Sequence, residues 1–500
     1  MGIVLNQSFK NTISTYLGFG IGAINTLFLY TNFLTDEYYG LVVFVLSTAT
    51  IMMPFMAFGV HNAIIKFYSS FKSKNSINSF LTLMLFLPLV FIIPTTLIGC
   101  IAYDTIGGLL SIENPIVENY VWHILVLAIA MAYFEIFFAW SKVQLQTVFG
   151  NLMKEIFHRI CTMLLLFAVY FDWISVEQFI LGLIGIYVLR MVIMKLYAFS
   201  IKFPKLKFQK IETLPSILKY AGLIIIAGSV AMLILDIDKF MIGRILKIEQ
   251  VAYYSVAIFI ATVIAVPQRA MHQIMMPLTA KYLNEHNLPA LKDLYKRSSL
   301  SLLVISGFIF LLIVLNINQL YQILPEEFTG GLFVVMIVSM AKLYDNSLGN
   351  NNAILFNSDY YRMVLFFGVL LAIMAIVLNA VFIPIYGIEG SAFATFLAVF
   401  IYNTIKILFV SRKFNMQPFT LNSIKILLML IVLSLVFYFW EFPCHPVVNI
   451  GLKSTLLFVI YFSLIFKLNI SEDITIQIRK YLRLKSTNAG MKNEKSRKVL

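Results

Sequence analysis

Stretches of about 20 consecutive apolar residues recur along nearly the whole chain, and they constrain the fold more than any other feature. A helix of that length rises about 30 Å, which is the thickness of the hydrocarbon core of a bilayer. Of the 500 residues, 60% are hydrophobic and only 12% are charged, whereas soluble domains are about a quarter charged. The sequence therefore predicts an all-α polytopic membrane protein.

The apolar windows predict about 14 transmembrane helices. An even number of spans places both termini on the same side of the membrane. The fifth and sixth windows are separated only by Asp172 and Trp173. The windows cover residues 12–34, 40–62, 79–103, 120–141, 152–171, 174–199, 216–236, 251–275, 299–322, 328–349, 362–382, 388–410, 421–441 and 449–468.

Basic residues are distributed unevenly between the two sides of this map. Of the 38 lysines and arginines, all but Lys239, Arg244, Lys247 and Lys453 fall on the side that carries the termini. Because cytoplasmic loops carry an excess of Lys and Arg, we expect cytoplasmic termini and a location in the cytoplasmic (inner) membrane. Basic loops that contact anionic lipids also account for the net charge of +14, so nucleic-acid binding is not implied.

A faint internal repeat predicts how the spans are grouped. Residues 34–40 resemble residues 246–252, and nearly the same spacing separates Pro54 from Pro267. Duplicated halves are common in transporters. We therefore expect two six-helix lobes, two appended helices and a basic cytoplasmic tail, at residues 1–210, 211–415, 416–470 and 471–500 respectively.

No motif in the sequence indicates catalysis. The three cysteines lie far apart and have no metal-ligand spacing, so no metal site is expected. No connection exceeds roughly 35 residues, which leaves no room for a nucleotide-binding domain. We expect a transporter without a cofactor, apart from a coupling ion, H⁺ or Na⁺.

Ionisable side chains inside spans are functional candidates, because each costs about 2.5–3.5 kcal/mol to insert. Lys342, Asp345, Asn346 and Asn350 follow one another at helical spacing in the tenth window. They either line a polar cavity, or Lys342 pairs with Asp345 near the inner interface.

Other charged residues in or near the spans also allow both a functional and a structural interpretation. Glu135 either binds a coupling ion or pairs with Lys142. Arg269 and His272 follow a predicted kink and either attract a phosphate group or serve as ordinary cytoplasmic-side charges. The acidic and basic residues from 236 to 244 are interpreted as a structural cluster.

Three junctions between predicted helices resemble a known family. Residues 33–68 (FLTDEYYGLVVFVLSTATIMMPFMAFGVHNAIIKFY), 236–257 (DIDKFMIGRILKIEQVAYYSVA) and 378–395 (LNAVFIPIYGIEGSAFAT) resemble polysaccharide-biosynthesis flippases of the multidrug/oligosaccharidyl-lipid/polysaccharide exporter superfamily. The resemblance assigns structural roles within these junctions to Asp238, Gly243, Tyr254, Asn379, Pro384, Gly387 and Gly390.

The resemblance implies two six-helix lobes around a central cavity, alternating access, and translocation of an undecaprenyl-pyrophosphate-linked oligosaccharide for O-antigen, capsule or exopolysaccharide synthesis. We expect Lys342, Arg269 and Arg190 to attract the pyrophosphate, Asn346 and Asn350 to contact it or the sugar, and Glu135 and Asp345 to couple an ion. The expected partners are the lipid-linked oligosaccharide, membrane lipids, a polysaccharide polymerase and other assembly proteins, and the chain is expected to be a monomer.

The sequence also departs from relatives of this family. It has no basic residue between Lys10 and Lys66, whereas peptidoglycan-precursor flippases are expected to carry arginines there, so lipid II is disfavoured as cargo. The first alternative is a cation or drug antiporter of the same fold. A mid-membrane carboxylate in the first span would favour that function, but the nearest polar residue there is Asn25. The second is a polysaccharide polymerase, although a long outer loop with paired Arg and Asp is missing.

Overall fold

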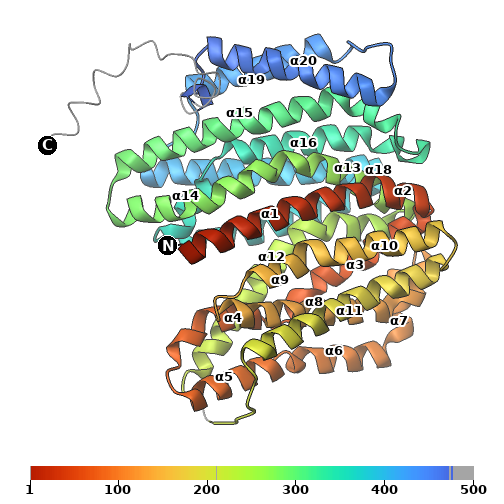
Figure 1. Cartoon of the computed structure of the whole chain (residues 1–500), viewed down its shortest axis with the longest axis vertical. Helices are drawn as coiled ribbons and strands as arrows, with labels where there is room; N and C mark the ends of the chain where they lie inside the picture. Colours follow the sequence, from red (N-terminus) through yellow and green to blue (C-terminus); the bar gives the residue numbers. More distant parts are fainter. Residues whose placement is uncertain (1, 210, 472–473, 477–500) are drawn as a thin grey trace. The chain divides into compact units, whose positions relative to one another are not determined.

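The architecture is helical throughout the part of the chain that the structure describes. The structure is a computed structural model and describes residues 2–209, 211–471 and 474–476. Every regular element among these residues is a helix (Figure 1). Eleven of the described helices are long and apolar enough to cross a membrane. The prediction of an all-α polytopic fold is therefore confirmed, whereas the count of 14 spans and the side of the termini stay predictions.

Four of the predicted spans do not appear as separate long helices. The eleventh and twelfth form one 54-residue helix, α18 (Tyr361–Phe414), which is broken at Gly387 with φ 60° and ψ −138°. The fifth is divided into α9 (Val148–Leu152), the π-helical η4 (Met153–Phe157) and α10 (His158–Tyr170). The thirteenth is the 17-residue α19 (Leu421–Phe437).

Side chains of the connecting segments fix where helices begin. Thr35 precedes α3 (Asp36–Met56), and its hydroxyl accepts a hydrogen bond from the Tyr38 N–H. Ser175 and Gln178 form a reciprocal capping box at the start of α11 (Val176–Ile201), which satisfies two N–H groups that a helix leaves unpaired. Asp172 has a φ of 57° and turns the chain between α10 and α11.

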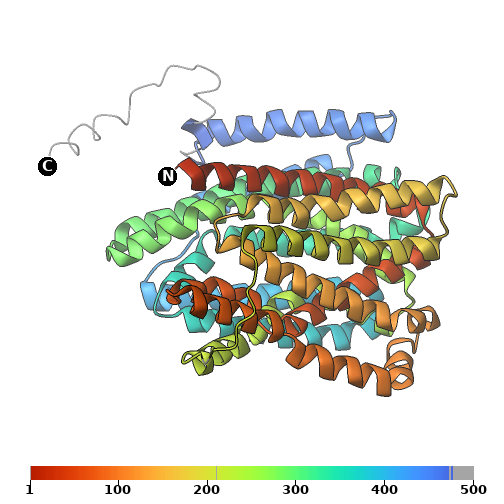
Figure 2. The same cartoon turned by 60° about the horizontal axis from the view of Figure 1, so that its bottom comes forward.

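The described chain forms two compact units. Unit 1 contains residues 1–262, 321–341 and 361–402. Within it α3 packs against α8, α12 and α13, α8 also packs against α11, and Figure 2 shows α10 and α11 running side by side. The predicted division into lobes of 1–210 and 211–415 stays a prediction.

The helices that begin in unit 1 and are not yet named are α1 (Gly2–Ile24), η1 (Asn25–Leu29), α2 (Tyr30–Phe33), α4 (Val60–Phe67), η2 (Tyr68–Ser70), α5 (Lys74–Phe86), α6 (Leu89–Ile101), α7 (Tyr103–Leu110), η3 (Pro115–Tyr120), α8 (Val121–Lys142), α12 (Leu214–Ile245), α13 (Glu249–Thr262), η6 (Glu326–Gly331) and α16 (Leu332–Ser347).

Unit 2 contains residues 263–320, 342–360 and 403–500, of which 472–473 and 477–500 lie outside the described residues. That gap includes most of the predicted basic tail. Apolar side chains of α15, α19 and α20 form one core. The Tyr461 hydroxyl donates to the Val304 carbonyl over 2.8 Å, and the Lys453 ammonium donates to the Leu315 carbonyl over 2.7 Å. The remaining helices are η5 (Val263–Ala265), α14 (Val266–Asn284), α15 (Leu288–Tyr321), α17 (Asn351–Asn357) and α20 (Pro446–Lys467).

Gly349 allows the chain to turn between α16 and α17, and its substitution is predicted to destabilise unit 2. Its φ is +60°, and a Cβ atom there would lie 2.6 Å from the Ser298 Oγ and from the Ser299 nitrogen. Gly349→Ala should lower the unfolding free energy by about 1–3 kcal/mol, measured as a lower melting temperature in detergent. Gly451→Ala is the control, because its Cβ would meet nothing within 4 Å inside α20; an equal loss in both variants would contradict the prediction.

Candidate functional site

Helices α8, η4, α10 and α11 of unit 1 bring five charged side chains into one neighbourhood. Three are basic, namely Lys154, Arg159 and Arg190, and two are acidic, namely Glu135 and Glu155. We call these five residues the charged cluster. Both carboxylates lie close enough to Arg190 to interact with it electrostatically. The cluster therefore has one more cationic than anionic charge.

Arg190 is the most enclosed member of the charged cluster. Its side chain is 7% exposed, and its guanidinium carbon lies 4.3 Å from the Phe134 ring centre and 4.6 Å from the Tyr187 ring centre. Two aromatic faces stabilise a desolvated guanidinium through cation–π attraction. Its buried Nε has no hydrogen-bond partner among the described residues, so one donor of this guanidinium is left unsatisfied in this conformation.

Glu135 forms an ion pair with Lys154 rather than with Lys142. The Lys154 Nζ lies 2.6 Å from the Glu135 Oε1. The Lys142 Nζ lies instead 3.9 Å from the ring centre of Phe138, one helical turn earlier on α8. The alternative in which Glu135 pairs with Lys142 is therefore wrong, because the nearer ring captures the ammonium group.

The third cation, Arg159, is held where α1 approaches the π-helical turn η4. Its Nη1 lies 3.6 Å from the Glu155 Oε2, and the Asn25 amide donates to its backbone carbonyl over 2.8 Å. A Cβ atom on Gly18 would lie 2.4 Å from the Glu155 carbonyl oxygen, and one on Gly22 would lie 3.3 Å from the Arg159 Nε. Only glycines in α1 leave room for this guanidinium.

The charged cluster has the chemistry of a site for a phosphate-bearing headgroup. Arginine presents N–H donors in a planar fork that matches phosphate oxygens bidentately. Lys154 and Arg159 are neutralised by carboxylates, and an anion of higher charge can compete for both. The cluster also combines these charges with rings and apolar helices, which suits an amphiphile better than a free ion.

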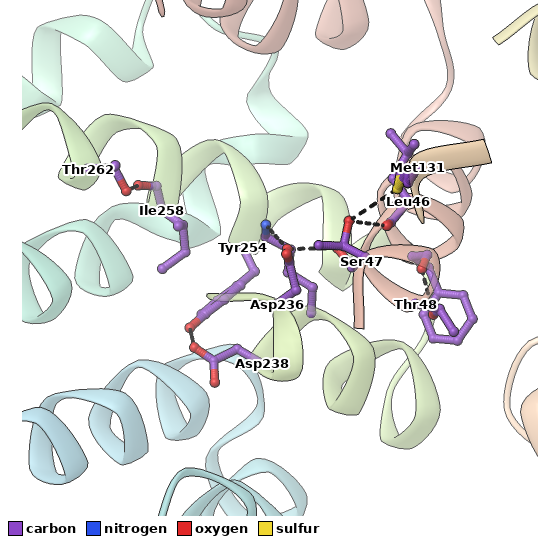
Figure 3. A network of polar contacts seen from close by, with 12 residues as sticks. Leu46, Ser47, Thr48, Met131, Asp236, Asp238, Tyr254, Ile258 and Thr262 are labelled. Atoms are coloured by element: carbon purple, nitrogen blue, oxygen red, sulfur yellow. Dashed lines mark hydrogen bonds and ion pairs between the residues drawn. The ribbon is translucent and has the colours of Figure 1, made fainter. Parts of the chain in front are cut away.

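A second polar centre of unit 1 surrounds Asp238 on α12 (Figure 3). Its carboxylate accepts hydrogen bonds from the Tyr254 hydroxyl over 2.8 Å, the Asn379 amide over 2.8 Å and the Thr395 hydroxyl over 2.7 Å. Among the described residues Asp238, at 7% exposed, is the only buried Asp or Glu. The centre ties α12 and α13 to α18, whereas nearby Asp236 pairs with Lys239 over 2.8 Å and accepts from Ser47 over 3.3 Å.

The other residues of the predicted junction motifs shape the backbone near this centre. A Cβ atom on Gly243 would lie 2.3 Å from the Phe44 ring, and one on Gly390 would lie 2.1 Å from the Phe382 carbonyl oxygen. Pro384 lies inside α18, three residues before the break at Gly387. These positions serve close helix packing.

Unit 2 holds the remaining predicted site residues. Asp345 accepts from the Asn403 amide over 3.0 Å and from the Gln268 amide over 3.4 Å, and it forms no ion pair with Lys342 within the described residues. Lys342 is half-buried, and Arg269 is exposed on α14. The proposed Lys342–Asp345 pair is therefore wrong, because amide donors occupy the carboxylate.

Asn346 and Asn350 are enclosed within the packing of unit 2. The Asn346 amide donates to the Ile264 carbonyl over 2.6 Å and to the Ser306 hydroxyl over 2.7 Å. The Asn350 amide donates to Thr279 over 2.8 Å. Both side chains are at most 1% exposed, so in this conformation they hold the break between α16 and α17 and are not accessible to a ligand.

Comparisons with known proteins agree with this architecture. The family model for "Polysaccharide biosynthesis protein" matches residues 4–283, which is more than half of the chain. The chain belongs to this polysaccharide biosynthesis family. No curated protein matches the sequence.

Solved structures resemble the fold of this family member at low sequence identity. A lipid II flippase, MurJ, in an inward closed conformation has a TM-score of 0.69 and 14% identity, and the match covers 92% of this chain and 99% of MurJ. Inward-facing and outward-facing structures of a multidrug resistance transporter of the MATE family and MOP superfamily have TM-scores of 0.56 and 0.54 and identities of 12% and 15%. These two matches cover 83% and 82% of this chain and 95% of each transporter. The neighbours in fold are thus flippases and transporters.

Sequence reasoning named two of the five members of the charged cluster of this polysaccharide biosynthesis protein, Arg190 and Glu135. It treated Lys154 and Arg159 as topology signals on a cytoplasmic loop. The sequence could have marked them as charges within a span, because both residues fall inside the fifth apolar window. Glu155 and Arg159 also stand one helical turn apart. Thr395, likewise missed, follows Ser391 by one helical turn, and the Ser391 hydroxyl donates to Asn379.

Replacing the buried carboxylate Asp238 is predicted to destabilise unit 1. Asp238→Asn exchanges an acceptor oxygen for an N–H₂ group and leaves at least one of three buried donors unsatisfied, at a cost of about 1–3 kcal/mol. The expected result is a lower melting temperature in detergent. Asp359→Asn, at an exposed position, is the control; equal melting temperatures for the two variants would show that the centre does not stabilise the fold.

Proposed function

We propose that this protein is a flippase that moves undecaprenyl-pyrophosphate-linked oligosaccharide repeat units across the cytoplasmic membrane. The repeat units would serve surface polysaccharide synthesis, as O-antigen, capsule or exopolysaccharide. The observation that carries the proposal is the charged cluster around Arg190, because a guanidinium within a span that has no carboxylate within ion-pair distance among the described residues favours an anionic ligand.

Three further features support a lipid-linked cargo. The chain belongs to a polysaccharide biosynthesis family, and its fold resembles those of a lipid II flippase and of multidrug transporters. A pyrophosphate carries enough negative charge to compete with Glu135 and Glu155 for Lys154 and Arg159. An amphiphilic cargo also accounts for charges embedded among apolar helices, which a soluble sugar would not require.

Binding and release follow from exchange of ion-pair partners in this scheme. Without cargo, Lys154 and Arg159 are compensated by carboxylates, so the charged cluster is stable while empty. With cargo, the phosphoryl oxygens take over these cations and the carboxylates turn to other donors. Arg190 holds the cargo throughout, because it has no carboxylate within ion-pair distance among the described residues.

Several predicted features remain proposals within this function. A coupling ion, H⁺ or Na⁺, at Glu135 or Asp345 stays a prediction, as do the headgroup contacts of Lys342 and Arg269. The polymerase and other assembly proteins remain the proposed partners. The protein itself is proposed to move its cargo without chemical change.

The distribution of cargo between leaflets tests the proposed function. Membranes from cells with and without this protein are compared for undecaprenyl-linked oligosaccharide on each leaflet, in a strain that has no redundant flippase. Accumulation of complete units on the cytoplasmic leaflet in the absence of the protein is expected. Normal delivery to the outer leaflet would remove the proposal and leave a small-molecule exporter of the same fold as the better account.

Arg190 is predicted to be required for this transport. Arg190→Ala should lower delivery to the outer leaflet at least about tenfold, since a charge-assisted bond contributes roughly 1.5–3 kcal/mol. Arg190→Lys should restore part of it, because charge is kept without the planar fork. Lys195→Ala on the same helix, at an exposed position over the Phe199 ring, is the control and should transport normally; full transport by Arg190→Ala would place the headgroup elsewhere.

A further inference from the structure

Asn114 connects two segments of unit 1 that are distant in sequence, through both amide hydrogens and the carbonyl oxygen of its side chain. Its amide donates to the Gly243 carbonyl over 2.8 Å and to the Leu246 carbonyl over 2.9 Å, and its Oδ1 accepts from the Ile248 N–H over 2.8 Å. The side chain is 6% exposed. Asn114 ends the loop between α7 and η3. Gly243 lies in the last turn of α12, and Leu246 and Ile248 lie in the connection between α12 and α13.

These bonds are not needed merely to end α12. The last carbonyls of a helix lack partners within it, but a local residue or water can satisfy them. The Leu246 N–H already closes the last turn onto Ile242. What Asn114 adds is a link between a segment from the first part of the chain and one that follows it by more than a hundred residues.

Close packing surrounds this link. A Cβ atom on Gly40, near the start of α3, would lie 2.0 Å from the Ile248 carbonyl oxygen. The Tyr253 hydroxyl donates to the Asp36 carboxylate. On the predicted orientation, the end of the helices where α3 begins and α12 ends faces the outside, so the contacts close the outer end of unit 1.

We infer that Asn114 is a latch that holds this end closed and releases it during transport. The inference rests on the proposed function for its alternating access, which requires the two segments to part at the outer end. Three neutral hydrogen bonds from a single side chain suit such a role, because water can replace all of them once that side chain withdraws. The Tyr253–Asp36 hydrogen bond and the packing of Ile248 against Gly40 join the same end and must also part, so loss of Asn114 is expected to weaken the closure and not to abolish it.

The inference predicts that Asn114→Ala exposes residues beneath the latch. The probe is Ser255→Cys in a background with Cys100, Cys161 and Cys444 replaced by serine. Ser255 is 7% exposed, its hydroxyl has no partner among the described residues, and it lies one helical turn from Val251, which approaches Gly243. With Asn114→Ala, a membrane-impermeant thiol reagent added outside intact cells should label this cysteine about tenfold faster.

Two controls separate release of the latch from loss of fold. Asn32→Ala removes an exposed asparagine of α2 whose amide donates only to Phe28 and Thr31, within four residues of it, and labelling should not change. Ser339→Cys, fully buried in α16 and also without a partner among the described residues, should stay unlabelled in the Asn114→Ala variant.

Each other outcome overturns the inference. An Asn114→Ala rate equal to that of Asn32→Ala means that the bonds hold nothing closed. Fast labelling of both probe cysteines means that Asn114 acts in folding alone, and acceleration only from the cytoplasmic side places the contact at the wrong end. The labelling assay does not measure movement of cargo, so failure of the proposed function in the leaflet test would leave a positive labelling result intact.

Discussion

Hydrocarbon offers no hydrogen-bond partner, so each polar side chain carried into the bilayer must be satisfied by another part of the chain. The described helices meet this constraint by pairing polar groups across elements. Lys453 donates to a carbonyl of α15, Asp238 accepts from two other helices, and Asn346 bonds to a carbonyl and a hydroxyl. The positions of the helices therefore depend on a small number of buried polar bonds as much as on apolar packing.

The same constraint separates structural polar residues from those that await a ligand. The amide nitrogens of Asn346 and Asn350 have protein partners within unit 2, although the buried Asn346 Oδ1, which carries no charge, has none among the described residues. Arg190 differs, since it is enclosed by rings yet has a buried Nε without an acceptor among the described residues. An unmet donor with a permanent charge is costly in a membrane, which is why this position marks a site better than the asparagines do.

The sequence could predict the helices because their signals are local. Apolar length, the break at Gly387 and the start of α11 at Ser175 are set by nearby residues. The partners within the charged cluster could not be predicted, because Glu135 and Lys154 lie on different helices and only packing decides that Lys142 turns to Phe138 instead. The partners of Asn114 could not be predicted either, because the sequence around a loop asparagine does not indicate whether its side chain bonds to water or to a distant turn.

Helix α8 is the shortest covalent connection between the latch and the charged cluster. It begins seven residues after Asn114, with only η3 between them, and Glu135 lies on it about 21 Å from its first residue. The helix packs along α3 and α11 within unit 1. A cargo that takes Lys154 from Glu135 changes the charge balance on α8 itself. In the proposed mechanism, opening at the latch and binding of the cargo therefore act on the same helix.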